Sequence, residues 1–451
     1  MINPFRRIGI PIVLCLMLAA VCGRLFAAPA IQMERFQLPN GLRVVLSANR
    51  NAPVVSTAVE YHVGSADERN DRTGFAHFFE HLMFEGTGNI PRKNIEQLLQ
   101  SVGARHNATT SCDATTYWIT LPSNQLKLAL WIESERMLHA KIDSIGVETQ
   151  RNVVKEERKQ RYDNVAYGAA WECIVAHLAA GTPYAWPPIG SEQYIDRASI
   201  DEFRDFYAKY YVPDNAVLAI AGDIDIERTR EWVIEYFSDI PRGKEIIRPD
   251  FTLPEIPDQH EATISDSRES LPAIIYTYGI NINDPSEYYA LKFLENILSN
   301  GRGSRLHTYL VDNLSIAYSA DAEFRTHEKG GFFRIAAVGN RDVPLSKLQL
   351  AFDSLIERIQ YHEVSAAEIM KARNYFKTLM AAYSMDTKTL ALGLASMETK
   401  YHDAGLLNSE LDRLLAVTPT DIQMAALKYL TPGGRFILTC LPVSKGGDNE
   451  K

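Results

Sequence analysis

The stretch from Gly74 to Gly86 reads GFAHFFEHLMFEG and holds two histidines and a glutamate close together. As a helix it would carry four apolar side chains on one face: Phe75, Phe78, Phe79 and Leu82. His77, Glu80 and His81 would share another face, with the two imidazoles one turn apart. Histidines at this spacing can reach one tetrahedral zinc ion while Glu80 stands beside it. The competing interpretation is two histidines held by hydrogen bonds in a Phe-rich core.

The chemistry that this pattern predicts is hydrolysis of a peptide bond. Zinc makes a bound water acidic and polarises the scissile carbonyl, and a neighbouring glutamate takes the proton and passes it to the leaving amine. His-x-x-Glu-His is the reverse of the commoner zinc-protease motif and is typical of the inverzincins. We therefore predict that His77 and His81 are zinc ligands and that Glu80 is the general base.

A third ligand is predicted on a helix that spans residues 147–162. Gln150, Val153, Val154 and Glu157 follow the spacing of one face, so Glu157 should point where the valines point. A carboxylate on an inward face is costly unless it is paired or bound to a metal. Glu157 is therefore the predicted ligand, whereas Glu156 is turned about 100° away. The alternative is a solvated acid on a charged helix.

The other elements of this region follow from local signals. Asn40-Gly41 predicts a hairpin turn between two strands, and residues 54–63 predict another strand. Periodicity predicts helices over 94–102, 126–138 and 199–211. One more helix is expected to begin at Gly222-Asp-Ile-Asp and to reach Phe237. The Thr-rich and aromatic stretch 103–122 favours strands. His106 lies in that stretch as a rival ligand, but it has no helical partner and is expected to be a surface or hydrogen-bonded histidine.

Length and composition indicate a soluble globular protein with two or more domains. The chain has 451 residues, of which 46% are hydrophobic and 23% charged, with a formal net charge of −9. This charge argues against a nucleic-acid groove. Residues 1–27 resemble a secretory signal, with Arg6 and Arg7 before an apolar run and a small-residue cleavage region. The mature chain should then be periplasmic or secreted, with no membrane segment.

Two other interpretations of the N-terminus stay open. The apolar run could remain as an uncleaved anchor, although it is short and contains Pro11. Cys22 could carry a lipid, although Val21 before it is bulky for such a site. Cys112, Cys173 and Cys440 are too few and too scattered for a disulfide framework, so they are expected to be small buried side chains.

The order of elements repeats after a polar, Pro-rich stretch. Lys209-Tyr210-x-x-Pro213 has a counterpart in Lys428-Tyr429-x-x-Pro432, and each is followed by a strand. We predict a zinc-bearing domain at 28–240, a linker at 241–260 and a homologous second domain at 261–451. Lys292 and Asn296 stand where the first copy has His77 and His81. One zinc ion per chain is expected.

These residues together resemble the insulinase/pitrilysin family of zinc peptidases, in the short two-domain form that includes mitochondrial processing peptidase. The resemblance covers nearly the whole mature chain. It is carried by the following segments: Gly64-Ser65, His77-x-x-Glu80-His81, Phe84-x-Gly86-Thr87, Asn107-Ala108-x-Thr110-Ser111-x-Asp113, and 151–157. It implies an α+β fold of two αβ-roll domains that enclose a chamber. It also implies that the substrate backbone adds to an edge strand at Asn107 and Ala108.

Two positions depart from the family pattern. Gln150 stands where the family usually has a glutamate that supports the site, and it brings no charge. Tyr318 matches a substrate-binding tyrosine of the second domain, but Val311 replaces the arginine seven residues before it. Arg302 or Arg305 could substitute locally. Otherwise a related subunit that lacks the zinc motif should supply the arginine and tyrosine in a heterodimer.

Three functions are compatible with this pattern. The first is a zinc-dependent metalloendopeptidase that hydrolyses peptides. The second is a non-catalytic scaffold or binding subunit of a peptidase complex, which typically loses the zinc motif. The third is a zinc hydrolase of non-peptide substrates, for which the sequence shows no pocket chemistry. The presence of His77, Glu80, His81 and Glu157 favours the first.

Overall fold

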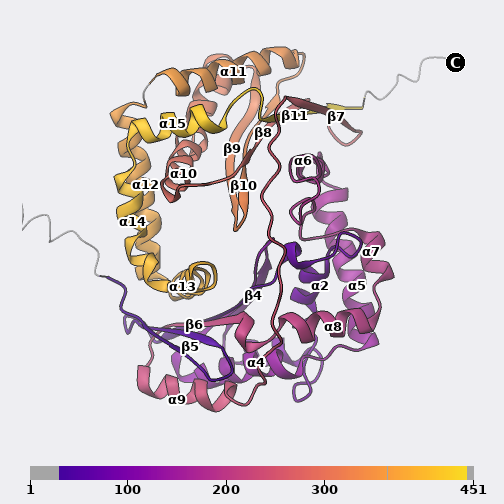
Figure 1. Ribbon diagram of the computed structural model, residues 1–451, viewed down its shortest axis with the longest axis vertical. Coiled ribbons are helices and arrows are strands. Elements are labelled where there is room, and N and C mark those ends of the chain that lie inside the picture. Colours follow the sequence, from indigo (N-terminus) through magenta and orange to yellow (C-terminus); the bar gives the residue numbers. More distant parts are fainter. Residues whose placement is uncertain (1–29, 363, 444–451) are drawn as a thin grey trace, which may run out of the picture. The chain divides into compact units, whose positions relative to one another are not determined.

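The computed structural model describes residues 30–362 and 364–443 (Figure 1). The predicted signal segment 1–27 and the candidate lipid site Cys22 lie outside this part. Every element below belongs to the compact unit that begins at Met33. Within the described residues, no helix is both long and apolar enough to cross a membrane.

A six-stranded sheet forms the core of the first half of the chain. Its strands are β1 (Glu34–Gln37), β2 (Arg43–Ala48), β3 (Val54–Tyr61), β4 (Arg105–Thr110), β5 (Thr115–Pro122) and β6 (Ala216–Gly222). They lie in the order β1-β2-β6-β3-β5-β4, which leaves β4 at an edge. The predicted turn at Asn40-Gly41 is confirmed, with Gly41 at a φ of 98°.

Helices cover this sheet and bury one hydrophobic core against it. They are α2 (Phe75–Leu82), α3 (Asn94–Ser101), α4 (Leu126–His139), α5 (Ser144–Arg158), α7 (Glu192–Arg197), α8 (Ile200–Tyr210) and α9 (Ile226–Phe237). The remaining helix of this half, α6 (Ala170–Leu178), belongs to a separate apolar cluster. A π-helical turn at Lys159–Asp163 follows α5. Ser199 caps α8 through a capping box with Glu202, as its position before Asp201 and Glu202 predicts.

The second half builds a five-stranded sheet. Its strands are β7 (His260–Asp266), β8 (Ala273–Ile280), β9 (Ala317–His327), β10 (Gly330–Gly339) and β11 (Arg435–Pro442). Its helices are α10 (Pro285–Ser299), α11 (Leu345–Tyr361), α12 (Ala366–Met385), α13 (Thr387–Tyr401), α14 (Leu407–Ala416) and α15 (Pro419–Tyr429), with a π-helical segment at His307–Asn313. The order of strands is β7-β11-β8-β10-β9.

The two sheets have the same topology, which confirms the internal repeat. β2 pairs with β6 in parallel and β7 pairs with β11 in parallel. β3 then lies between β6 and β5, and β8 lies between β11 and β10, all antiparallel. β4 and β9 are therefore equivalent edge strands, and α2 and α10 are the first α-helices after β3 and β8. The fold is α+β, with two related αβ layers.

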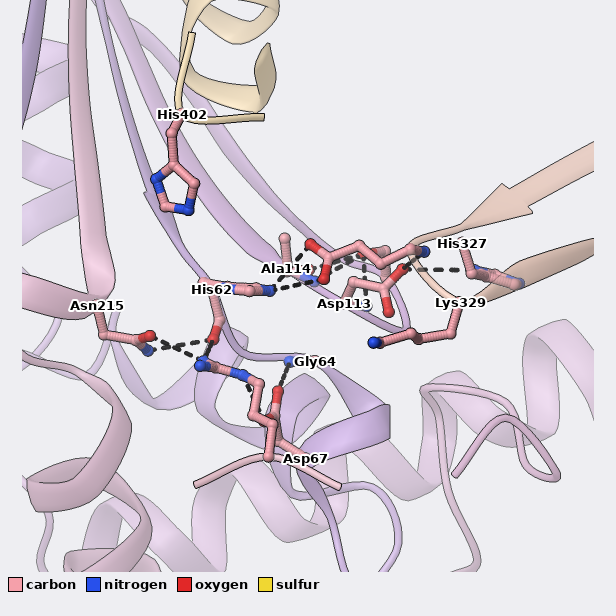
Figure 2. A network of polar contacts seen from close by, with 12 residues as sticks. His62, Gly64, Asp67, Asp113, Ala114, Asn215, His327, Lys329 and His402 are labelled. Carbon is pink, nitrogen blue, oxygen red and sulfur yellow. Dashed lines mark hydrogen bonds and ion pairs between the residues drawn. The ribbon is translucent and has the colours of Figure 1, made fainter. Parts of the chain in front are cut away.

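Contacts between the halves involve α13 and the tip of the β9–β10 hairpin. α13 packs on β3 and β6 of the first sheet, opposite α4 and α9 in Figure 1. At the hairpin tip, His62 Nε2 lies 2.9 Å from a carboxylate oxygen of Glu328, and the Glu328 amide donates to Asp113 (Figure 2). Tyr184 donates to the other oxygen of Asp113 at 2.6 Å. These bonds tie the second sheet to the loop that follows β4.

The three cysteines in the described part are free. Cys112 and Cys440 are buried, as expected, while Cys173 on α6 is only partly buried. Cys173 and Cys440 belong to a cluster in which α6 packs against β8, β10 and β11.

Candidate metal centre

α2 is held by the apolar face that the sequence predicts. Phe75, Phe78 and Phe79 are buried, and the ring of Phe78 lies 4.5 Å from that of Phe203 on α8. Packing of this face turns the opposite face of α2 away from the core. His77 and His81 lie on that opposite face, with ring centroids 4.9 Å apart. The helix ends at Leu82, one turn before the expected Gly86.

The N-terminus of α2 is capped from a distance by Glu68. Gly74 occupies the N-cap position with a φ of 97° and has no side chain to offer. The carboxylate of Glu68 accepts the amide of Gly74 at 2.9 Å and that of Ala76 at 2.8 Å. The indole of Trp186 also donates to it at 3.1 Å. The sequence alone does not indicate this role, because no local capping pattern joins Glu68 to an amide six residues away.

Glu157 on α5 converges on the two histidines. Its Oε2 lies 3.0 Å from His81 Nε2 and 3.5 Å from His77 Nε2. Hydrogen bonds to His77 and His81 hold the pKa of Glu157 well below its ordinary range, although burial opposes them. Glu156 is exposed and points elsewhere. The structure thus brings together the three residues that were predicted to converge.

The donor set fits a zinc ion. Ligand atoms at about 2.0–2.1 Å from a tetrahedral ion lie about 3.4 Å from one another. The two distances from Glu157 Oε2 bracket this value, and the three ligand atoms all lie within 4.8 Å of one another. Two imidazoles and one carboxylate are also a donor set of catalytic zinc sites. Among the described residues this is the single such group.

The surroundings of the ligands are only partly paired. Arg161 lies 2.9 Å from Glu157 Oε1 and leaves Oε2 to the histidines. His77 Nδ1 and Gln150 Oε1 are buried without a hydrogen-bond partner in the described part of the chain. Gln150 donates through Nε2 to Glu85 at 2.5 Å, and Glu85 is paired with Arg92. Gln150 therefore contacts a carboxylate whose charge is paired with Arg92.

Glu80 lines a cavity of about 710 Å³ together with His81, His106 and Asn107. The hydroxyl of Thr110 on β4 donates to Glu80 Oε2 at 2.6 Å. Asn107 and Ala108 lie on the same strand, whose far side has no neighbouring strand in the sheet. His106 packs on the ring of Phe84, and burial lowers its pKa. It lies outside the group of metal ligands, as expected.

The residues expected from the second half lie apart from this centre. Tyr318 is 71% exposed at the start of β9, and Val311 packs against the second core. Arg305 forms a two-pronged ion pair with Glu368, at 2.6 and 2.9 Å, and is thereby occupied. Arg302 is exposed. None of these four lines the cavity beside Glu80.

The fold and the site define a class: a two-sheet α+β chain whose first half presents an inverted His-x-x-Glu-His helix beside a glutamate on a second helix. Comparison with known families agrees. The model described as Insulinase (Peptidase family M16) matches residues 43–172, and the one described as Peptidase M16 inactive domain matches residues 197–376. The chain belongs to the insulinase family, peptidase family M16.

Individual relatives match over most of the chain. The zinc protease PqqE of Helicobacter pylori is 28% identical over 343 residues, which are 75% of this chain and 77% of that protein. The crystal structure of a protease from Helicobacter pylori matches with a TM-score of 0.87 and 25% identity, over 92% of this chain and 100% of that one. The first half of the periplasmic protease PqqL from Escherichia coli matches with a TM-score of 0.72 and 21% identity, over 92% and 93%.

Proposed function

We propose that this protein is a zinc-dependent endopeptidase that hydrolyses peptides. The observation that carries the proposal is the convergence of His77, His81 and Glu157 at zinc-ligand spacing, with Glu80 beside them on the wall of a cavity. The three residues hold one zinc ion. That ion supplies Lewis-acid polarisation of the scissile carbonyl and of the attacking water.

The remaining steps fall to side chains and backbone of this chain. Glu80 takes the proton of the attacking water and delivers it to the leaving amine. The free edge of β4 at Asn107 and Ala108 pairs with the substrate backbone, which lays an extended peptide along the cavity. Edge pairing recognises main chain rather than side chains, so it suits unfolded peptides of varied sequence.

The role assignment is tested with three isosteric variants of the purified mature chain. Glu157→Gln should lower zinc occupancy, because a ligand is lost. Glu80→Gln should keep zinc and abolish turnover, because a base is lost without loss of a ligand. Glu156→Gln, exposed on the same helix as Glu157, is the matched control. Full zinc retention in the first variant or near-normal rates in the second would refute the assignment.

A non-catalytic role in a peptidase complex is the second candidate. The family model that matches residues 197–376 describes an inactive domain, and it covers the half without a metal group. The zinc-dependent rate of the wild-type chain discriminates between the two functions. A chain that binds zinc and peptides but gives no hydrolysis with any partner supports the non-catalytic role.

We further propose that the chain works as a heterodimer with a related subunit. Val311 removes the cation expected beside Tyr318, and Arg305 is engaged by Glu368. This chain matches 48% of the whole PqqL chain, so that protein carries a further half beside the one that matches. A missing cationic contact to the reacting carbonyl should cost about 2–4 kcal/mol of transition-state stabilisation. High activity of the wild-type chain alone, unchanged by Val311→Arg or by the partner, would refute the pairing.

We also propose that the protein is exported to the periplasm and that it has two domains joined by a linker. Residues 1–27 act as a cleaved signal, and domains at 28–240 and 261–451 are joined by 241–260. The stretch between α9 and β7 contains no helix or strand, which supports the linker. N-terminal sequencing of native protein tests export. A start at a lipid-bearing Cys22, or an intact Met1, would contradict it.

A further inference from the structure

We infer that Thr110 is a positioning residue that sets the orientation of the Glu80 carboxylate. Its hydroxyl donates to Glu80 Oε2 at 2.6 Å, a length typical of a hydrogen bond from a hydroxyl to an ionised carboxylate. The inference rests on the proposed function, in which Glu80 is the base. It adds a residue outside the zinc ligands whose effect passes through Glu80.

The hydroxyl of Thr110 is held rigidly. Thr110 pairs with Thr115 at the last rung of the β4–β5 ladder, so its backbone is fixed by the sheet. A second bond joins the neighbouring strand β5 to the same helix, because Tyr117 on β5 donates to the carbonyl of Phe79 at 3.2 Å. Tyr117 fixes the backbone of α2 next to Glu80, and Thr110 fixes the side chain of Glu80. A carboxylate tied in this way cannot rotate freely about its last torsion.

The bond also distinguishes the two carboxylate oxygens. Oε2 accepts from Thr110, whereas no hydrogen bond of Oε1 is found within the described residues. Oε1 is therefore the oxygen left to accept the proton of the attacking water. Loss of the Thr110 hydroxyl would let the carboxylate rotate and would reduce the fraction of time that Oε1 faces the reacting atoms.

The position of Thr110 links the base to the substrate strand. Asn107 and Ala108 lie on the same strand β4, so the edge that would pair with the peptide and the hydroxyl that orients Glu80 belong to one rigid element. A peptide placed in register on β4 is thereby placed in register with Glu80. We expect Thr110 to affect the rate of the chemical step and not the binding of peptide.

The test uses three variants of the full mature chain, with its partner present if the wild type needs it. Thr110→Val removes the hydroxyl and keeps the branched shape. Thr110→Ser restores a hydroxyl. Thr109→Val makes the same change at the neighbouring exposed residue, whose side chain points to the opposite face of the strand. Zinc content, kcat, KM and the affinity for a peptide hydroxamate are measured for each.

The expected result is a fall in kcat of about 10–100-fold for Thr110→Val, with zinc content and KM unchanged and with rescue by Thr110→Ser. Hydroxamate affinity should fall as well, because this inhibitor shares a proton with the base, and that readout does not need turnover. A zinc-loaded wild type whose kcat and hydroxamate affinity survive Thr110→Val refutes this inference alone. A wild type that binds no zinc refutes the proposed function and this inference with it.

Discussion

Replacement of Glu68 by alanine should destabilise the protein through the N-terminus of α2. The Glu68 side chain is buried, and its carboxylate accepts the amides of Gly74 and Ala76. A buried donor left without a partner costs about 1–3 kcal/mol, so two such amides give about 2–6 kcal/mol. The lower end agrees with the loss of an ordinary N-cap. Glu68→Gln keeps the volume and one acceptor oxygen and should cost about half as much.

The same change should weaken zinc binding, because His77 lies in the first turn of the helix that Glu68 caps. We expect a loss of about 10–100-fold in zinc affinity, as for other groups that support ligands from behind. Urea unfolding of the metal-free protein measures the stability, and competition with a chelator measures the zinc affinity. Glu156→Ala, at an exposed acid, is the control. Unchanged values of both quantities in Glu68→Ala would refute the capping role.

Glu68 should also make stability depend on pH. Burial raises the pKa of this carboxyl from 4.5 to about 8, although the amides of Ala76 and Gly74 and the indole of Trp186 lower it. The folded protein then binds more protons than the unfolded chain between these two values. The stability from protonated Glu68 is full below pH 4.5 and is lost as the pH rises through 8. The stability of the wild type relative to Glu68→Gln should therefore decline over this range. A constant difference would show that the three donors keep Glu68 ionised.

Two other contacts give predictions of different size. Arg136 and Glu133 form a fully buried ion pair at 3.1 Å. Arg136→Met leaves the Glu133 carboxylate unpaired and should lower the free energy of unfolding in urea by about 3–5 kcal/mol. The double variant with Glu133→Leu should recover most of this loss. Recovery fails if Arg136 acts chiefly through its bond to the carbonyl of Met83 at the end of α2. Glu328→Gln should weaken the partly buried contact with His62 by only about 1 kcal/mol. A larger loss of the unfolding free energy would show that the hairpin tip is the main contact that holds the two halves together.

Local patterns predicted the elements that position the centre. The 3.6-residue period identified α2 and α5, since each packs one apolar face on the core. Ser199 and Thr418 stand at the starts of α8 and α15, and each forms a capping box within its own first turn. These signals act over a few residues, and the sequence displays them directly.

One detail of the α5 pattern was wrong. Val153 and Val154 were both expected to face inward with Glu157, but Val154 is buried and Val153 is 43% exposed. The inward face is centred on Val147 and Val154. These two residues are seven positions apart, which is about two helical turns, so they lie on the same side of the helix. Glu157 lies close enough to this centre to reach the histidines, so the ligand prediction did not depend on Val153.

The supporting contacts were not predictable from spacing. Thr110 meets Glu80 and Glu68 meets Ala76 only because β4 and the turn after β3 are brought to α2 by the sheet. Their partners follow from tertiary packing, which no short-range period encodes. Thr110 belongs to a segment that resembles the family, but this resemblance did not indicate a role for its side chain.

The shared topology of the two sheets gives a physical reason to look for a second chain. Tyr318 lies on β9, the edge strand equivalent to β4, and it is exposed rather than packed against its own half. In the first half, the equivalent edge strand borders the metal group and the cavity. In the second half, Lys292 and Asn296 stand at the positions of the histidines. Lys292 forms an ion pair with Glu295 at 3.1 Å. Tyr318 therefore lies on an edge whose own half presents no candidate metal group among the described residues. In the proposed heterodimer the related subunit supplies the tyrosine and the arginine, because this chain has Val311 at the position of the arginine. The first half of this chain supplies the base.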